Sequence, residues 1–192
     1  MIKRNFKKLL RKLGYKEITQ SETSKVRHLV QKYCVGYGCD IGFGGDKIMK
    51  LNCDGIDYAK PYTKTGVDKV DIACDLFKER IPVNNNTYDY VYSSHLIEDF
   101  PDTIKILKDF IRILKNDGIL ILVFPDQIKY AKHCEETKQP LNIHHVHPNM
   151  GLKFMYSKLN EIENVNYSTI FESNCEIDYN VIMVLKIKKW EV

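Results

Sequence analysis

Short apolar segments alternate with helical ones along the middle of the chain. Strands are predicted around Tyr37 to Ile41, at Gly55 to Tyr58, near Val70 to Cys74 and at Tyr88 to Ser93. The run ILILVF at 119–124 is apolar without alternation, as expected of a central parallel strand that is covered on both faces. Strands that alternate with helices indicate βαβ units, so the pattern predicts a mostly parallel sheet.

The predicted helices follow from apolar residues that repeat on one face. The clearest runs from Asp102 to Leu114, with apolar residues at 104, 107, 111 and 114, and the sequence NDG at 116–118 supplies a stop. A shorter helix is expected from about Asp46 to Leu51, after the first strand, and another around residues 26–30.

Two connections depart from this alternation. Residues 59–66, between the second and third strands, contain a proline and a glycine without helical period, which predicts a bare loop. Near the C-terminus, residues 164–173 and 176–186 look like two strands joined by a tight turn at about Asn174. The expected fold is α/β: a Rossmann-like, doubly wound, mostly parallel sheet with a C-terminal antiparallel hairpin, in a single domain.

Composition narrows the class of protein. A chain of 192 residues with 44% hydrophobic residues buries one good core, which favours one domain. No apolar run approaches the ~20 residues that cross a bilayer, and the N-terminus lacks the apolar stretch of a secretory signal. The six cysteines include no CxxC pair and no zinc-ligand spacing. We therefore expect a cytoplasmic protein with buried free thiols and no metal site.

Positive charge is concentrated at the N-terminus. The net charge is +4, but residues 1–16 hold seven Lys and Arg side chains and no acid, which leaves about −3 for the rest. Apolar residues at 2, 6, 9, 10 and 13 have helical spacing, so residues 1–32 are interpreted as a basic helical leader before a domain at 33–192. Three interpretations of the leader stay open: a helix packed on the domain, peripheral contact of residues 1–16 with a membrane or polyanion, and a targeting segment.

A glycine turn after the first predicted strand carries the strongest chemical signal. Residues 40–46 read DIGFGGD, an acid at a strand end followed by glycines that let backbone approach a ligand closely. In a doubly wound sheet the ligand lies beyond the carboxyl ends of the strands. A polar residue stands at the end of each of the other strands as well: Asp57, Asp75, Ser93 with Ser94, and Asp126 after Pro125.

These residues, together with YDYVYSSHLIE at 88–98 and RILKNDGIL at 112–120, resemble the class I S-adenosylmethionine-dependent methyltransferases. The nearest branch is the small-molecule methyltransferase type 11 group. The resemblance extends from about Tyr37 to Pro125, and it rests on the order and spacing of the motifs. It implies S-adenosyl-L-methionine as cofactor and methyl transfer as the reaction.

The resemblance also implies cofactor contacts at the first two strand ends. The backbone from Gly42 to Gly44 would approach the methionine part, with Asp40 orienting its ammonium group. Asp57 would accept hydrogen bonds from both ribose hydroxyls, because the paired oxygens of a carboxylate suit a vicinal diol. The alternative for each carboxylate is a solvated loop residue or a cap.

Further contacts are implied at the next two strand ends. Asp75 would accept from the adenine amino group, with Asp71 as a nearby competitor for that role, and Leu76 would pack on the ring or lend its amide. Ser93 would lie beside the methionine amino group.

The chain departs from the family pattern at three positions. Asp46 stands in place of the third glycine, Phe43 where a small residue or cysteine is common, and Asp99 where a histidine is frequent. The first two leave cofactor binding intact, while the third leaves the role of that position open.

The expected acceptor lid is the segment from Asp126 to Pro148, which has little helical period and carries four of the six histidines. In the branch that this chain resembles, an Asn followed three residues later by a His is frequent here, which matches Asn142 and His145. A histidine or carboxylate suits removal of a proton from the acceptor near pH 7.

Four residues are therefore candidates for catalysis. His145 is favoured as general base, followed by His147 and Asp126, and His95 at the mouth of the fourth strand is the rival. One alternative is that these histidines are lid residues or helix caps. Another is that the three clustered histidines bind a metal together with Asp126, although their spacing is not a standard one.

The expected reaction is O-methylation of a small polar metabolite, a sugar or a cell-surface glycan precursor, with a phosphorylated metabolite also considered. Nucleic acid is an unlikely acceptor, because no Asn/Asp-Pro-Pro-aromatic motif follows the fourth strand and no Pro-Cys occurs. Two alternatives are a catalytically inactive partner or regulatory subunit of this fold, and an RNA- or membrane-associated methyltransferase guided by the leader. The oligomeric state is left open.

Overall fold

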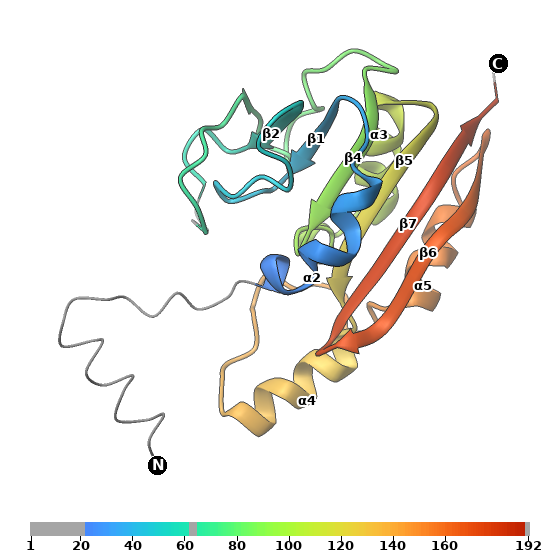
Figure 1. Cartoon of the computed structure of the whole chain (residues 1–192). Helices are drawn as coiled ribbons and strands as arrows, with labels where there is room; N and C mark the ends of the chain where they lie inside the picture. Colours follow the sequence, from blue (N-terminus) through green and yellow to red (C-terminus); the bar gives the residue numbers. More distant parts are fainter. Residues whose placement is uncertain (1–21, 62–64, 191–192) are drawn as a thin grey trace.

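The computed structural model describes residues 22–61 and 65–190, which form a seven-stranded sheet with helices on both faces (Figure 1). The strand order is β3-β2-β1-β4-β5-β7-β6. Strands β1 to β5 are parallel, and β7 lies antiparallel between β5 and β6. The predicted α/β class, the mostly parallel sheet and the C-terminal antiparallel hairpin are confirmed. The strands are β1 Gly38–Ile41, β2 Cys53–Asp57, β3 Ile72–Ala73, β4 Tyr88–Ser94, β5 Leu114–Pro125, β6 Val165–Ile177 and β7 Asn180–Lys189.

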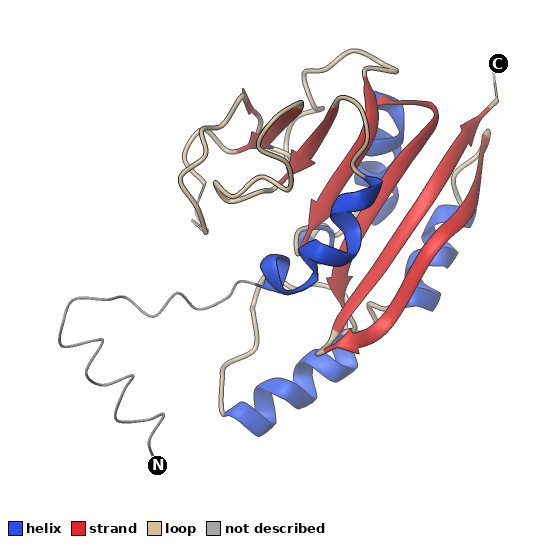
Figure 2. Ribbon diagram, viewed as in Figure 1, coloured by secondary structure: helices blue, strands red, loops and turns tan. Residues whose placement is uncertain are grey.

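Helices lie on both faces of the sheet, and α4 extends beyond its lower end in this view (Figure 2). They are α2 Glu22–Val30, η1 Gln31–Tyr33, η2 Ile97–Asp99, α3 Thr103–Ile113, α4 Gln127–Thr137 and α5 Leu152–Asn160. Helices α3 and α5 cover one face, where Leu107, Phe110 and Met155 are fully buried. Helix α2 covers the other face, where Val26 lies in one apolar cluster with Tyr90 and Tyr92 of β4. The central strands are therefore buried on both sides, as the apolar run at 119–124 predicts.

Helix α3 forms where the sequence predicts it. Asp102 caps its N-terminus by accepting the N–H of Lys105 at 2.9 Å, and Leu114 ends it in an extended conformation. The predicted bare loop between β2 and β3 also holds for the described residues, which contain no helix between Tyr58 and Asp71. The short helix around residues 26–30 is present as part of α2.

The prediction of a helix from about Asp46 to Leu51 is wrong, because this segment is an irregular loop. Other side chains take the backbone groups that a helix would pair internally. Asp40 accepts the N–H of Ile48 at 2.6 Å, and Arg27 donates to the carbonyl oxygens of residues 46 and 47. Tertiary contacts thus replace a helix that six residues are too few to stabilise.

In the C-terminal half one prediction is wrong, and one helix was not predicted. The turn of the hairpin lies at residues 178–179 and not at Asn174, since Asp178 adopts a φ of +52° and Ile177 pairs with Asn180. Residues 174–177 instead form an irregularity within β6. The segment after Asp126 is helical as α4, which buries only Cys134 and therefore shows no apolar period.

The predicted basic leader lies mostly outside the described residues, including its amphipathic part at 1–16, so its role and the boundary at residue 33 stay predictions. Among the residues that the structure describes, no helix is both long enough and apolar enough to cross a membrane. All six cysteines are free thiols, and five of them are buried while Cys175 is half-buried.

Candidate active site

A pocket of about 520 Å³ opens at the carboxyl ends of β1, β2 and β4. Its floor comes from the glycine turn after β1, from Asp57 at the end of β2 and from Ser94 at the end of β4. The first turn of α2 adds Glu22 and Thr23. The opposite wall comes from η2, from α4 and from the loop that contains Asn142, His144 and His145.

The glycine turn depends on backbone conformations and clearances that side chains would destroy. Gly42 has a φ of +73°, and a Cβ there would lie 2.7 Å from the Cδ2 atom of Leu96. Gly44 has a φ of +57° and lines the pocket. Both glycines therefore bring backbone without a Cβ atom to the pocket wall, and their contact with the cofactor stays a prediction.

Asp57 is tied to this turn by its carboxylate. One oxygen accepts the N–H of Gly44 at 2.9 Å and the other accepts the N–H of Tyr58 at 2.7 Å. Burial raises the pKa of Asp57, and the two backbone N–H groups oppose this effect. Each oxygen keeps a free lone pair, so the carboxylate fits a ligand with two neighbouring hydroxyls.

Asp40 does not line the pocket. Its carboxylate is buried beneath the turn, where it accepts the N–H of Ile48. Burial raises the pKa of Asp40 to about 8, although the hydrogen bond from Ile48 and the charge of Arg27 lower it. Asp40 thus holds the loop after the turn from inside.

The two residues expected at the adenine end, Asp75 and Leu76, do not line the pocket, and neither does Ser93. Asp75 accepts a hydrogen bond from the hydroxyl of Tyr58 at 3.0 Å, so Tyr58 connects Asp75 to Asp57. Leu76 is buried in the core that α3 covers. Ser93 is buried as well and donates its hydroxyl to the carbonyl of Ile41 at 3.1 Å.

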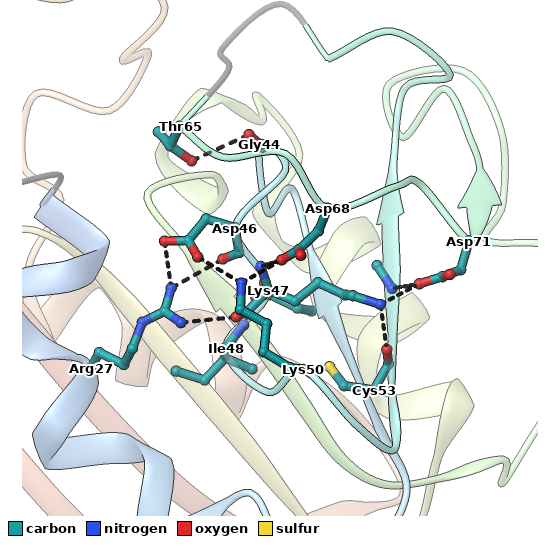
Figure 3. Close-up of polar contacts among 12 residues, drawn as sticks. Arg27, Gly44, Asp46, Lys47, Ile48, Lys50, Cys53, Thr65, Asp68 and Asp71 are labelled. Atoms are coloured by element: carbon teal, nitrogen blue, oxygen red, sulfur yellow. Dashed lines mark hydrogen bonds and ion pairs between the residues drawn. The ribbon is translucent and has the colours of Figure 1, made fainter. Parts of the chain in front are cut away.

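Ion pairs hold the loop that follows the glycine turn (Figure 3). The carboxylate of Asp46 lies between Arg27 at 2.7 Å and Lys50 at 3.1 Å. Asp68 binds Lys50 at 2.6 Å and accepts the N–H of Lys47 at 2.9 Å. These contacts give a structural reason for an acid at 46, where the family pattern has a glycine.

The crossover loop between β2 and β3 covers the glycine turn. Thr65 donates its hydroxyl to the carbonyl of Gly44 at 3.2 Å (Figure 3). The N–H of Thr65 donates to the same oxygen at 2.8 Å, and the N–H of Asp68 donates to the carbonyl of Gly45 at 2.7 Å. Thr65 and Pro61 also line the pocket. This loop therefore forms one side of the site in place of a crossover helix.

The structure brings two of the four predicted catalytic residues together. His95 and His145 both line the pocket, and both face Glu98, with ring nitrogens 3.4 Å and 3.7 Å from its Oε1 atom. Burial is the largest influence on each pKa. Burial lowers the pKa of His145. For His95, the contacts with Glu98, Asn180 and Glu22 together outweigh burial, so the pKa is raised.

The other two candidates have contacts outside the pocket wall. His147 places its Nε2 atom 2.7 Å from the carbonyl oxygen of Phe100 and 3.0 Å from the hydroxyl of Thr103. Asp126 caps α4 by accepting the N–H of Lys129 at 3.0 Å. Among the described residues no group of three or more His, Cys, Asp or Glu side chains is arranged to hold a metal ion.

Sequence reasoning missed several residues of the pocket wall. Glu98 is the most notable, since it is an acid that is 1% exposed within the apolar segment LIEDFP. Its position among aliphatic residues was a usable signal. Glu22 and Thr23 gave no signal, because only the packing of α2 on the sheet brings them to the site.

Comparison with known proteins identifies the family. The model of the methyltransferase domain family matches residues 4–160, so the chain belongs to this family. S-adenosylmethionine is therefore its cofactor, and the residues of the turn and Asp57 fit that group. No curated protein sequence matches the chain significantly.

Solved structures of the same fold agree with this family. The PH0226 protein from Pyrococcus horikoshii is 15% identical, with a TM-score of 0.64 over 88% of this chain and 91% of that chain. A SAM-dependent methyltransferase from Archaeoglobus fulgidus is 14% identical, with a TM-score of 0.61 over 85% and 92%. One from Aquifex aeolicus is 10% identical, with a TM-score of 0.56 over 94% and 97%. The predicted class I methyltransferase fold is confirmed.

Proposed function

We propose that the protein methylates an oxygen atom of a small, polar, uncharged acceptor such as a sugar hydroxyl. The observation that carries the proposal is the arrangement of one pocket, in which a glycine turn and Asp57 face a wall that holds His95, Glu98 and His145. A donor site and a proton-accepting group thus share one cavity, as methyl transfer to a hydroxyl requires.

The cofactor contacts proposed from this arrangement begin at the turn. The backbone of Gly42 and Gly44 would receive the methionine part, and Asp57 would accept the ribose hydroxyls. Asp75 and Leu76 would reach the adenine end, since Tyr58 connects Asp75 to Asp57. Asp40 and Ser93 would support the turn from below. When bound, S-adenosylmethionine supplies a methyl group on a sulfonium that an aligned nucleophile attacks.

His145 is the proposed general base. Its Nδ1 atom lies 2.9 Å from the Oε1 atom of Gln127, an acceptor, so the Nδ1 position carries the proton and Nε2 is the free basic atom. The lowered pKa of His145 keeps it neutral near pH 7. The proposal does not use His147 or Asp126 as a base, because each is engaged elsewhere.

The charge of the wall supports an uncharged acceptor. Four carboxylates line the pocket, at Glu22, Asp57, Glu98 and Asp99, and none of its described lining residues is Lys or Arg. A phosphate ester would bring two negative charges to this surface, and like charges repel strongly where water is excluded. A phosphorylated metabolite is thus the less favoured of the acceptors expected from the sequence.

The test is methyl transfer to matched acceptors. Purified full-length protein is incubated with labelled S-adenosylmethionine and with free sugars, their phosphate esters and their amino derivatives, and label in the product is counted. We expect transfer to a free sugar at least tenfold above its phosphate ester. Preferred transfer to the phosphate ester, or to the nitrogen of an amino sugar, would refute the proposed acceptor class.

The catalytic assignment needs its own control. His145→Ala should lower turnover by about 10²- to 10⁴-fold, the usual contribution of general base catalysis. His28→Ala is the matched control, because His28 is exposed on α2 and does not line the pocket. Affinity for S-adenosylhomocysteine should stay unchanged in both variants.

A further inference from the structure

Glu98 is a buried carboxylate without a direct hydrogen bond in the described part of the chain. Its side chain is 1% exposed, and neither Oε1 nor Oε2 has a hydrogen-bond partner there. Such burial is costly unless nearby charge compensates it. The backbone of Glu98, by contrast, does form a hydrogen bond: its carbonyl accepts the N–H of Val146 at 3.1 Å. Glu98 therefore contacts both the end of β4 and the loop that carries His145.

The orientation of Asn180 determines the protonation of His95. The amide nitrogen of Asn180 donates to Glu22 at 3.2 Å and to the carbonyl of Ile177 at 3.1 Å. Its Oδ1 atom is then an acceptor, 2.7 Å from Nε2 of His95, so Nε2 carries a proton. The other nitrogen, Nδ1, lies 3.4 Å from Glu98, where an attached proton gives an ion pair.

His145 also faces Glu98, but with a ring nitrogen that carries no proton. Its Nδ1–H donates to Gln127, which leaves Nε2 with a lone pair 3.7 Å from Glu98. Burial lowers the pKa of His145 most, and among the charged groups that face it Glu98 raises this pKa while His95 and His144 lower it. The ring of Tyr130 on α4 also packs on His145, with centroids 4.8 Å apart. The groups that face His95 are Glu98, Asn180 and Glu22, all of which raise its pKa.

We propose that Glu98 is a positioning residue that keeps His95 as an imidazolium, and that burial and the positive charge of this imidazolium keep His145 as a neutral base. This inference rests on the proposed function, because it assigns a purpose to the neutral state of His145. When the acceptor O–H bond breaks, its electron pair stays on oxygen and its proton passes to Nε2 of His145. The imidazolium that forms lies next to Glu98, which stabilises it electrostatically.

Proton NMR of the histidine rings tests this without an acceptor. The full chain is saturated with S-adenosylhomocysteine and titrated, and the six histidines are assigned with single substitutions. In the unmodified protein we expect His95 to titrate above, and His145 below, the ordinary histidine value of 6.5. Equal midpoints, or the reverse order, would overturn the proposal even if no variant folds.

Glu98→Gln then isolates the carboxylate. It should lower the midpoint of His95 by about 1–3 pH units, as expected when an opposite charge within 4–6 Å is removed. Glu135→Gln is the matched control, because Glu135 is exposed on α4 and outside the pocket wall. An unchanged midpoint of His95 in Glu98→Gln would refute the role of Glu98.

The outcome is separable from that of the proposed function. If the histidines titrate as expected but His145→Ala keeps full turnover, Glu98 still positions the two rings and the assignment of the base is what fails. If Glu98→Gln lowers turnover while S-adenosylhomocysteine affinity is retained, and the pH optimum moves with the titration of His145, both proposals stand.

Discussion

The guanidinium of Arg27 and the carboxylate of Asp46 lie 2.7 Å apart, and this ion pair connects α2 to the loop behind the glycine turn (Figure 3). The same guanidinium donates to the carbonyl oxygens of residues 46 and 47. One side chain thus supplies donors to a loop that lacks internal helical hydrogen bonds. Because α2 also brings Glu22 and Thr23 to the pocket, the ion pair connects two of the segments that line the site.

Arg27→Ala should destabilise the protein and weaken cofactor binding together. Loss of hydrogen bonds from a charged donor typically costs about 1.5–3 kcal/mol of unfolding free energy. Urea unfolding and calorimetry with S-adenosylhomocysteine measure the two effects. Lys50→Ala is the control, since its side chain is 60% exposed and an exposed ion pair contributes only about 0–1 kcal/mol. Equal effects of the two substitutions would contradict this prediction.

Asp57→Asn should reduce affinity for S-adenosylhomocysteine at least tenfold. The two oxygens of Asp57 face the N–H groups of Gly44 and Tyr58, and an amide would turn a donor toward one of them. Calorimetry measures the change. Asp117→Asn at an exposed site is the matched control and should bind like the unmodified protein. Full affinity in Asp57→Asn would remove Asp57 from the cofactor site.

Asp40→Asn should flatten the dependence of stability on pH. The pKa of Asp40 is raised to about 8 in the folded protein from an ordinary value of 3.8, so folding favours the neutral acid. Its contribution is full below pH 4 and is lost as the pH rises through about 8. Unfolding free energies measured at pH 5 and pH 9 should therefore fall more in the unmodified protein than in Asp40→Asn. Parallel curves would show that Asp40 is charged when folded.

His147→Ala should act on stability and leave turnover nearly unchanged. Nε2 of His147 faces the carbonyl of Phe100, which only accepts, so this nitrogen donates and is not free to take a proton. Loss of the hydrogen bond should lower the unfolding free energy by about 0.5–1.5 kcal/mol. Thermal unfolding and the methyl-transfer assay measure the two effects. A hundredfold fall in turnover with intact cofactor binding would make His147 a catalytic candidate again.

The accuracy of sequence reasoning here depended on whether a signal was local. The strand ends, α3 and the glycine turn were predictable, because periodicity, the cap at Asp102 and glycine spacing are written in neighbouring residues. The loop at 46–51 was not predictable, since Arg27 and Asp68 shape it from distant elements. Helix α4 was missed for a different reason: it buries a single cysteine, so its sequence carries no apolar stripe.

For the site, too, local signals were readable from the sequence and contacts between distant residues were not. Candidates at strand ends and in the histidine-rich loop could be named from the sequence, but their grouping could not. His95 and His145 are 50 residues apart along the chain, and only the fold shows that both face Glu98.

Gly45 and Gly66 bring the glycine turn and the crossover loop into direct backbone contact. A Cβ on Gly45 would lie 2.8 Å from the carbonyl oxygen of Gly66, so the two backbones touch without side chains between them. Thr65 and Asp68 add hydrogen bonds across the same contact. Displacement of either loop by itself would therefore break the hydrogen bonds that Thr65 and Asp68 donate to the glycine turn.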